Sequence, residues 1–343
     1  MSRRYTPAMN TLLEPPMVAT SPPLPTPVHV PVLLAETLEA LAPRRGGRYI
    51  DGTIGGAGHA TAILEHSFPD GLLLGLDRDA ATLSYAGHRL APFAERAILV
   101  HAAFDSLANV AVSLGWTAVD GILLDLGFSS LQLAGTGRGF SFQRDEPLDM
   151  RLDQDAATPT AADILAETSK ADLAALLFRF GEEPAARRIA REIARRRTAT
   201  PLRTTGQLHQ AVWSAVGGRH GAAIDPATRT FQALRIAVND ELGQLERVLP
   251  RAIALLKPGG RLAVISFHSL EDRIVKQQFA RAAAACLCPP ELPECRCGHR
   301  PEVRVLWRKP RTPGADEILH NPRARSAKLR AVERLEGVAL CNK

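Results

Sequence analysis

The stretch Asp51-Gly52-Thr53-Ile54-Gly55-Gly56-Ala57-Gly58-His59 joins a short predicted strand, residues 48–51, to a predicted helix through residues 60–65. Glycines in such a turn let the backbone approach a ligand closely, and the start of the helix presents free N–H groups. Tight turns of this kind also arise for purely structural reasons. The glycines therefore mark a candidate binding turn without identifying its ligand.

Apolar runs and helical stretches alternate on the C-terminal side of this turn. We predict further strands at 71–77, 97–101, 119–125 and 261–267, with helices near 80–90 and through 231–256. Two later segments, 303–307 and 326–332, can complete the sheet. Continuous apolar strands that alternate with helices are typical of a mostly parallel sheet covered on both faces. The sequence predicts an α/β fold.

The alternation stops between residues 137 and 235, where the pattern is mostly helical. We therefore expect one α/β domain, residues 29–136 and 236–335, interrupted by an inserted helical domain over 137–235. The proline-rich residues 1–28 are expected to form a disordered leader, and residues 336–343 a tail.

Composition narrows the class of protein. The chain has 343 residues, of which 45% are hydrophobic and 23% charged, a mixture typical of globular domains. No apolar run approaches the roughly 20 residues that span a bilayer, and we expect no membrane association. The first residues lack the apolar core of a secretory signal, and five cysteines are too few for a disulfide scaffold, so we expect a cytoplasmic protein. The net charge of +6 weakly favours a polyanionic partner.

Three nucleotide-binding turns compete for the glycine-rich stretch. A dinucleotide fingerprint would need a glycine at Thr61, and a phosphate-binding loop starting at Gly52 would need one at Ala57, followed by a lysine. Both patterns fail. The remaining candidate is a turn that binds S-adenosylmethionine.

Residues at the ends of the next strands favour this candidate. Asp77 ends the second strand, 19 residues after Gly58, where a carboxylate can accept both ribose hydroxyls. Phe104 follows the third strand and can lie against adenine, and Asp125 ends the fourth at the edge where open α/β folds bind ligands. Each has a plainer alternative: a solvated loop acid for Asp77 and an ordinary core aromatic for Phe104. Their order along successive strand ends makes the cofactor interpretation the stronger one.

Several long motifs resemble those of the bacterial RsmH (MraW) family, which methylates cytosine N4 in small-subunit ribosomal RNA. The resemblance covers about residues 29–335. The matching stretches lie at 29–36, 51–59, 121–127 (Gly121-Ile122-Leu123-Leu124-Asp125-Leu126-Gly127), 138–151, 228–235 (Thr228-Arg229-Thr230-Phe231-Gln232-Ala233-Leu234-Arg235), 265–273 (Ile265-Ser266-Phe267-His268-Ser269-Leu270-Glu271-Asp272-Arg273) and 321–326.

The resemblance implies a Rossmann-like class I methyltransferase domain with an inserted helical domain that binds RNA. It implies S-adenosylmethionine as cofactor and, as substrate, a cytidine in the decoding region of 16S rRNA, presented as rRNA or as the 30S particle. The family's turn usually reads Gly-Gly-His where this chain has Ala57-Gly58-His59, and alanine permits the same backbone contact provided that its φ stays negative. The implied cofactor contacts are Ala57, Gly58, His59, Asp77, Phe104, Asp125 and Gln132.

Methylation of the cytosine amine needs a proton acceptor, because the lone pair of that nitrogen is delocalised into the ring. Many amino-methyltransferases carry two prolines after the acid of the fourth strand, and this chain does not. The candidate acceptors are Asp125, Ser129 and His268, with a structural His268 bonded to Asp272 as the alternative. Methylation at C5 would need a cysteine nucleophile, and none lies near the end of the fourth strand.

Two cysteine pairs, Cys286-x-Cys288 and Cys295-x-Cys297, lie outside the family pattern. Four thiolates can hold a structural zinc, but paired zinc ligands are usually separated by two or more residues. From spacing alone we expect reduced thiols in a loop and no metal.

Residues 184–197 predict a helix with one basic face. Ala186, Ile189, Ala190 and Ile193 share the apolar side, and Glu192 is the only acid among the arginines. One acid cannot neutralise these arginines through ion pairs along the helix, so the basic face should be able to bind phosphates. The alternative is a merely solvated face, which is the commoner fate of charge runs. The expected RNA contacts are Arg188, Arg191 and Arg195.

Two other classes of function remain open from the sequence. One is a nucleic-acid-binding ribosome assembly factor with a non-catalytic cofactor pocket. The other is a nucleotide-dependent oxidoreductase, for which the required glycine fingerprint is missing.

Overall fold

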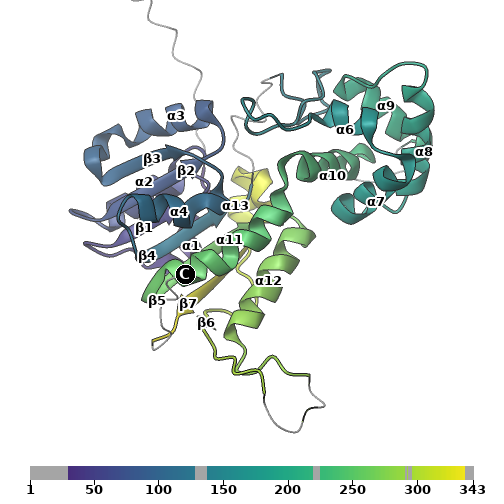
Figure 1. Ribbon diagram of the computed structural model, residues 1–343. Helices are drawn as coiled ribbons and strands as arrows, with labels where there is room; N and C mark the ends of the chain where they lie inside the picture. The colour runs from purple at the N-terminus through teal and green to yellow at the C-terminus, as the bar shows by residue number, and fades with distance from the viewer. Residues whose placement is uncertain (1–29, 128–136, 219–224, 290–291, 293–295, 337–343) are drawn as a thin grey trace, which may run out of the picture.

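The computed structural model describes residues 30–127, 137–218, 225–289, 292 and 296–336, and within them a seven-stranded sheet organises the chain (Figure 1). The strand order is β3-β2-β1-β4-β5-β7-β6. The strands are β1 (Arg48–Asp51), β2 (Leu72–Asp77), β3 (Ala97–His101), β4 (Val119–Asp125), β5 (Leu256–Ser266), β6 (Val303–Val305) and β7 (Lys328–Arg334).

The first five strands run parallel, and β7 pairs antiparallel with both β5 and β6. β1 lies between β2 and β4, and its Tyr49 pairs with Leu73 of β2 and with Gly121 of β4. The predicted mostly parallel sheet is confirmed, and the late antiparallel pair completes it as expected. Because parallel strands end at the same edge, the turns after β1, β2 and β4 are brought together there.

Helices cover both faces of the sheet, and alternate residues of each strand point to opposite sides. On one face Ile50, Leu74 and Leu124 pack against α4 (Leu107–Ser113), α11 (Glu241–Leu255) and α12 (Ser269–Ala283). The other face packs against α1 (Leu34–Leu41), α2 (Gly58–His66) and α3 (Ala80–Leu90). Shorter helices complete the domain: η1 (Ala91–Arg96), η2 (Phe104–Ser106), α13 (Ala315–His320) and η3 (Pro322–Ser326).

A separate group of helices lies beside the sheet domain, and α10 leads back from it (Figure 1). Its own apolar core includes residues from Leu148 to Val238. The helices are α6 (Ala161–Glu167), α7 (Lys170–Gly181), α8 (Ala186–Arg197), α9 (Thr205–Val216) and α10 (Ala227–Asn239). The helical insertion is thus confirmed, whereas the domain limits at 137 and 235 stay predictions.

The single helix predicted through 231–256 is wrong. The chain forms α10 and α11 instead, and they meet at Asp240, whose φ of 48° is left-handed. A left-handed residue ends the hydrogen-bond ladder of a helix and turns the chain. This turn places the start of α11 over the carboxyl edge of the sheet.

The predicted leader, residues 1–28, lies outside the described residues, as does nearly all of the predicted tail. Among the helices that the structure describes, none combines the length and apolarity needed to cross a membrane.

Candidate active site

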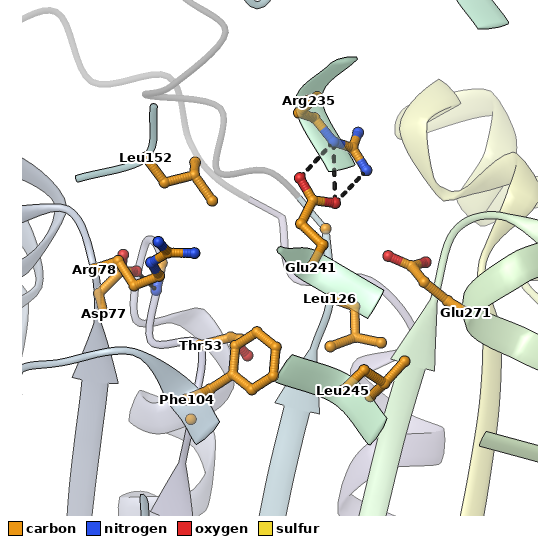
Figure 2. A pocket seen from close by; sticks show the side chains of 13 residues that line it. Thr53, Asp77, Arg78, Phe104, Leu126, Leu152, Arg235, Glu241, Leu245 and Glu271 are labelled. Atoms are coloured by element: carbon orange, nitrogen blue, oxygen red, sulfur yellow. Dashed lines mark hydrogen bonds and ion pairs between the residues drawn. The ribbon is translucent and has the colours of Figure 1, made fainter. Parts of the chain in front are cut away.

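A cleft opens at the carboxyl edge of the sheet (Figure 2). Its floor is formed by the turn after β1 and by the ends of β2 and β4, and α11 and α12 form one side. The insertion reaches it through Leu152. The lining residues are Gly52, Thr53, Gly55, Asp77, Arg78, Phe104, Leu126, Gly127, Leu152, Arg235, Glu241, Leu245 and Glu271.

Backbone atoms form part of the cleft because glycine is sterically required there. A Cβ on Gly52 would lie 2.6 Å from Cδ2 of Leu124, and one on Gly127 would lie 2.6 Å from the ring of Phe267. Both distances are too short for real Cβ atoms. Packing against Leu124 and Phe267 thus accounts for these two glycines, and the ligand of the candidate binding turn stays a prediction.

Asp77 lies at one end of this cleft and holds the glycine turn. One carboxylate oxygen accepts the N–H of Gly55 at 3.1 Å, and the other accepts the N–H of Asp79 at 3.0 Å. Burial raises the pKa of Asp77 to about 6, although these backbone donors oppose the rise. Phe104 and Thr53 also line the cleft (Figure 2). Asp77 and Phe104 are thus brought to one cleft, as predicted.

Asp125 lies behind the cleft floor next to the buried His59 and Asp51, and 17% of its own side chain is exposed. Burial raises its pKa to about 7, while an N–H from Gly127 lowers it. Its Oδ2 lies 3.6 Å from Nδ1 of His59, and its Oδ1 is buried without a hydrogen-bond partner among the described residues. Burial also raises the pKa of the neighbouring Asp51 to about 7, with His59 opposing this. Carboxyl groups with such pKa values exchange protons near neutral pH.

Thr53 connects Asp125 with the buried Asp51. Its hydroxyl accepts the backbone N–H of Asp125 at 2.6 Å, and its own N–H donates to Asp51 at 3.1 Å. Thr53 was not among the predicted site residues. The signal in the sequence was its position, directly after the acid that ends the first strand and the glycine that follows it.

The stretch Ala57-Gly58-His59 is buried and does not line the cleft. Ala57 caps α2 with a φ of 58°, so the condition of a negative φ is not met; this left-handed conformation suits the glycine that the family usually has here. His59 approaches the carbonyl of Val32 through Nε2 at 2.9 Å. That these residues contact the cofactor stays a prediction.

His268 is the N-cap residue of α12, and its partner is Glu271 rather than the expected Asp272. Nδ1 accepts the N–H of Glu271 at 3.4 Å, and Nε2 lies 3.1 Å from a carboxylate oxygen of Glu271 without hydrogen-bond alignment. Asp272 instead binds Lys328 at 3.2 Å and Arg330 at 2.6 Å. The capping role of His268 makes it a weaker acceptor candidate than Asp125.

The upper side of the cleft comes from residues that the sequence analysis did not single out (Figure 2). Arg235 of α10 and Glu241 of α11 form an ion pair with a shortest distance of 2.7 Å across the bend at Asp240. Arg78 reaches up to the carbonyl of Asn239 at 2.9 Å. Arg235 lies in the family motif at residues 228–235. The turn that brings Glu241 to it is not marked by any change in the hydrophobic periodicity of the sequence.

Glu241, His268 and Glu271 offer ligand atoms within 4.8 Å of one another. They do not suit a metal, because both oxygens of Glu241 are held by Arg235 and Glu271 caps α12.

The helix predicted over 184–197 is α8, and its predicted apolar face is the buried one: Ala186, Ile189, Ala190 and Ile193. The expectation that no ion pair neutralises the basic face is wrong for its C-terminal part. Glu192 binds both Arg195 and Arg196 at 2.7 Å. Arg187, Arg188 and Arg191 are exposed, and among the described residues no hydrogen bond or ion pair holds them.

Ser129 and Gln132 lie outside the described residues. Their predicted catalytic and cofactor roles remain predictions.

Comparison with known proteins decides the family. The model of the MraW methylase family matches residues 26–335 of the chain. The chain belongs to the MraW methylase family. This confirms the resemblance seen in the sequence and identifies the protein as a methylase.

Curated relatives agree over almost the whole chain. A ribosomal RNA small subunit methyltransferase H from Geotalea daltonii is 54% identical over 90% of this chain and 98% of its own. Proteins of the same name from Symbiobacterium thermophilum and Thermomicrobium roseum are 53% and 52% identical, over 90% and 93% of this chain and 97% of each relative. Among solved structures, a putative rRNA methylase from Clostridium thermocellum shows a distant likeness, with a TM-score of 0.44 at 10% identity over 90% of this chain and all of that one.

The methyl donor of this family of methylases is S-adenosylmethionine, and the cleft suits it. Its lining combines the carboxylate of Asp77, the ring of Phe104 and the backbone of Gly52 and Gly127, groups that can bind a ribose, an adenine and an amino-acid group. The donor supplies an activated methyl group, and the residues of this chain bind and orient it.

Proposed function

We propose that this protein transfers a methyl group from S-adenosylmethionine to the N4 amine of a cytidine in the decoding region of 16S rRNA. The observation that carries the proposal is a glycine-lined cleft with Asp77 at one end and Asp125 behind its floor, in a chain of the MraW methylase family. Relatives that are more than 50% identical are named ribosomal RNA small subunit methyltransferase H.

The chemistry requires a proton acceptor beside the methyl donor. Cytosine N4 is a weak nucleophile and becomes stronger when an acceptor holds one of its hydrogens. Asp125 suits this role because it ends β4 beside the cleft, keeps 17% of its side chain exposed, and has a pKa of about 7. A group with a pKa near the working pH is ionised often enough to accept a proton and basic enough to keep it.

The RNA backbone would contact the insertion. Arg187, Arg188 and Arg191 project from the exposed side of α8, opposite the face that packs into the core of the insertion. Arginine contacts to phosphates position RNA without reading its sequence. The expected partner is small-subunit rRNA, alone or in the 30S particle.

Purified protein can be tested with radiolabelled S-adenosylmethionine and two substrates from cells that lack this modification, free 16S rRNA and 30S particles. We expect N4-methylcytidine in digested RNA from at least one of them. Calorimetry shows whether S-adenosylmethionine binds and NAD does not. Binding of the donor and RNA without transfer to either substrate would favour an assembly factor over an enzyme.

A further inference from the structure

The connection between α12 and β6 carries a cluster of thiols. Sγ atoms of Cys286, Cys288 and Cys297 lie within 4.8 Å of one another, and those of Cys286 and Cys297 are 3.8 Å apart. Cys295, the fourth cysteine of the two pairs, lies outside the described residues. The spacing of the pairs favoured reduced thiols, but the folded chain brings these three sulfurs to one point.

The distance between the sulfurs excludes a disulfide and fits a zinc site. A disulfide needs its sulfurs about 2.0 Å apart, far closer than the 3.8 Å between Cys286 and Cys297. Tetrahedral zinc binds thiolates at about 2.3 Å, which places two ligand sulfurs about 3.8 Å apart. The observed separation therefore equals the edge of a zinc–thiolate tetrahedron.

Backbone N–H groups are directed at the same sulfurs. Leu287 donates to Cys297 at 3.4 Å, Cys288 donates to Cys286 at 3.3 Å, and Arg296 donates to Cys288 at 3.4 Å. Donors of this kind stabilise negative charge on sulfur and orient metal ligands. All three sulfurs of the cluster thus accept a backbone N–H, an arrangement that orients metal ligands.

We propose that Cys286, Cys288 and Cys297 bind a structural zinc ion. Soft thiolates select zinc over magnesium or calcium. Three thiolates leave one tetrahedral position, which the described residues do not fill. The ion would close a loop between residues 11 positions apart and fasten the connection from α12 to β6.

The location of the cluster assigns the ion to structure rather than catalysis. Glu271, in the first turn of α12, lines the cleft, whereas the cysteines follow the last residue of this 15-residue helix. A helix of that length separates its ends by about 22 Å. The loop is also tied to the helix end by His299, whose Nε2 lies 3.1 Å from the carbonyl of Arg281.

Elemental analysis of the purified full chain, produced without a metal-binding tag and in the presence of a reductant, tests this proposal. We expect about one zinc per chain, with loss of most of it in Cys286→Ser and in Cys297→Ser. Cys341→Ser is the matched control, since it removes the remaining cysteine of the chain outside the two pairs, and it should keep its zinc.

A second measurement uses the wild-type chain and so does not depend on whether the serine variants fold. Titration with a mercurial reagent should release zinc in step with the thiols that react, as followed by a colorimetric metal indicator. Thermal denaturation should show a lower Tm after the ion is removed, while S-adenosylmethionine affinity stays within about twofold. Reduced protein that contains no zinc and takes up none when reconstituted would overturn the proposal. So would a disulfide in the protein as isolated, iron in place of zinc, or full zinc content in both serine variants.

Discussion

Nδ1 of His59 lies 3.6 Å from Oδ2 of Asp125 in the buried layer beneath the cleft. The other ring nitrogen, Nε2, is 2.9 Å from the carbonyl of Val32, and a carbonyl can only accept, so Nε2 carries a proton. Nδ1 is then the nitrogen that faces Asp125, and it carries a lone pair when the ring is neutral. Burial favours the uncharged form of both groups, since it raises the pKa of Asp125 and lowers that of His59.

The rate of methyl transfer should depend on the ionisation of Asp125. If the ionised carboxylate accepts the amine proton, the single-turnover rate at saturating cofactor should rise tenfold per pH unit below about pH 7 and level off above it. Asp125→Asn should lower the rate by 10²- to 10⁴-fold, roughly the contribution of a general base. Calorimetry should show nearly unchanged S-adenosylmethionine affinity. A parallel loss of affinity would make Asp125 a cofactor ligand, and a near-normal rate would remove it from the site.

Asp51→Asn is the matched control for Asp125→Asn, because Asp51 is a neighbouring carboxyl whose pKa is also about 7. It also carries a separate prediction on stability. Burial raises the pKa of Asp51 from 3.8 to about 7, so the folded chain binds a proton that the unfolded chain has lost between these pH values. The stability due to this group is therefore greatest below pH 4 and falls as pH rises toward 7. Asparagine does not titrate, so the variant should not lose stability in this way as pH rises. Asp51→Asn should therefore raise Tm relative to wild type more at pH 8 than at pH 5. Equal shifts at both pH values would contradict the buried, proton-binding state of Asp51.

Asp77 should control binding of the nucleoside part of the cofactor. Asp77→Ala should weaken S-adenosylmethionine binding by roughly ten- to a hundredfold, the effect of losing a charge-assisted hydrogen bond worth about 1.5–3 kcal/mol. Because Asp77 also accepts the N–H groups of Gly55 and Asp79, the Tm of the variant must be measured alongside. Unchanged affinity would refute the ribose contact.

The pKa of Asp77 gives a second test with methylthioadenosine, which has the ribose and adenine but no amino-acid group. The ionised carboxylate is the better acceptor, so affinity should rise with pH up to about 6 and then stay level. Asp77→Asn should abolish this dependence. A variant that keeps the same profile would assign the titration to another group.

The sequence predicts those site residues that lie at the ends of strands. The predicted limits of β1, β3 and β4 match the structure, because short apolar runs closed by an acid or histidine mark buried parallel strands. Asp77 and Asp125 follow directly from these limits. Continuous apolar runs and glycine spacing carry this information locally.

The remainder depends on contacts between distant segments. Nothing in the helical pattern of residues 231–256 marks the left-handed Asp240, so the bend that brings Glu241 to Arg235 was missed. The pairing of Glu192 with Arg195 was missed because helix periodicity does not say which of several neighbouring arginines an acid selects. The thiol cluster depends on how a loop folds back, which cysteine spacing alone does not fix.

The structure divides the arginines of α8 into two groups with different expected effects on RNA binding. Arg188→Ala and Arg191→Ala should each flatten the dependence of log affinity on log salt by about 0.7–0.9, the value for one phosphate contact. Arg195→Ala should have a smaller effect, because Glu192 already binds this side chain. Binding of 16S rRNA fragments can be followed by fluorescence anisotropy at several salt concentrations.

Arg45→Ala is the matched control for this series. Arg45 is exposed and precedes β1, at the edge of the sheet opposite the cleft. It should leave both affinity and salt dependence unchanged. If Arg188→Ala and Arg191→Ala behave like Arg45→Ala, this face of α8 is a solvated surface.

N4-methylation of 16S rRNA by this protein can be measured by mass spectrometry of its nucleosides. The rRNA is taken from a strain that lacks the gene for this protein and from the same strain complemented with wild type or Asp125→Asn. The account predicts that one cytidine of the decoding region loses its N4-methyl group in the deletion strain, that wild type restores it, and that the variant does not. Full N4-methylation of that cytidine in the deletion strain would contradict the account.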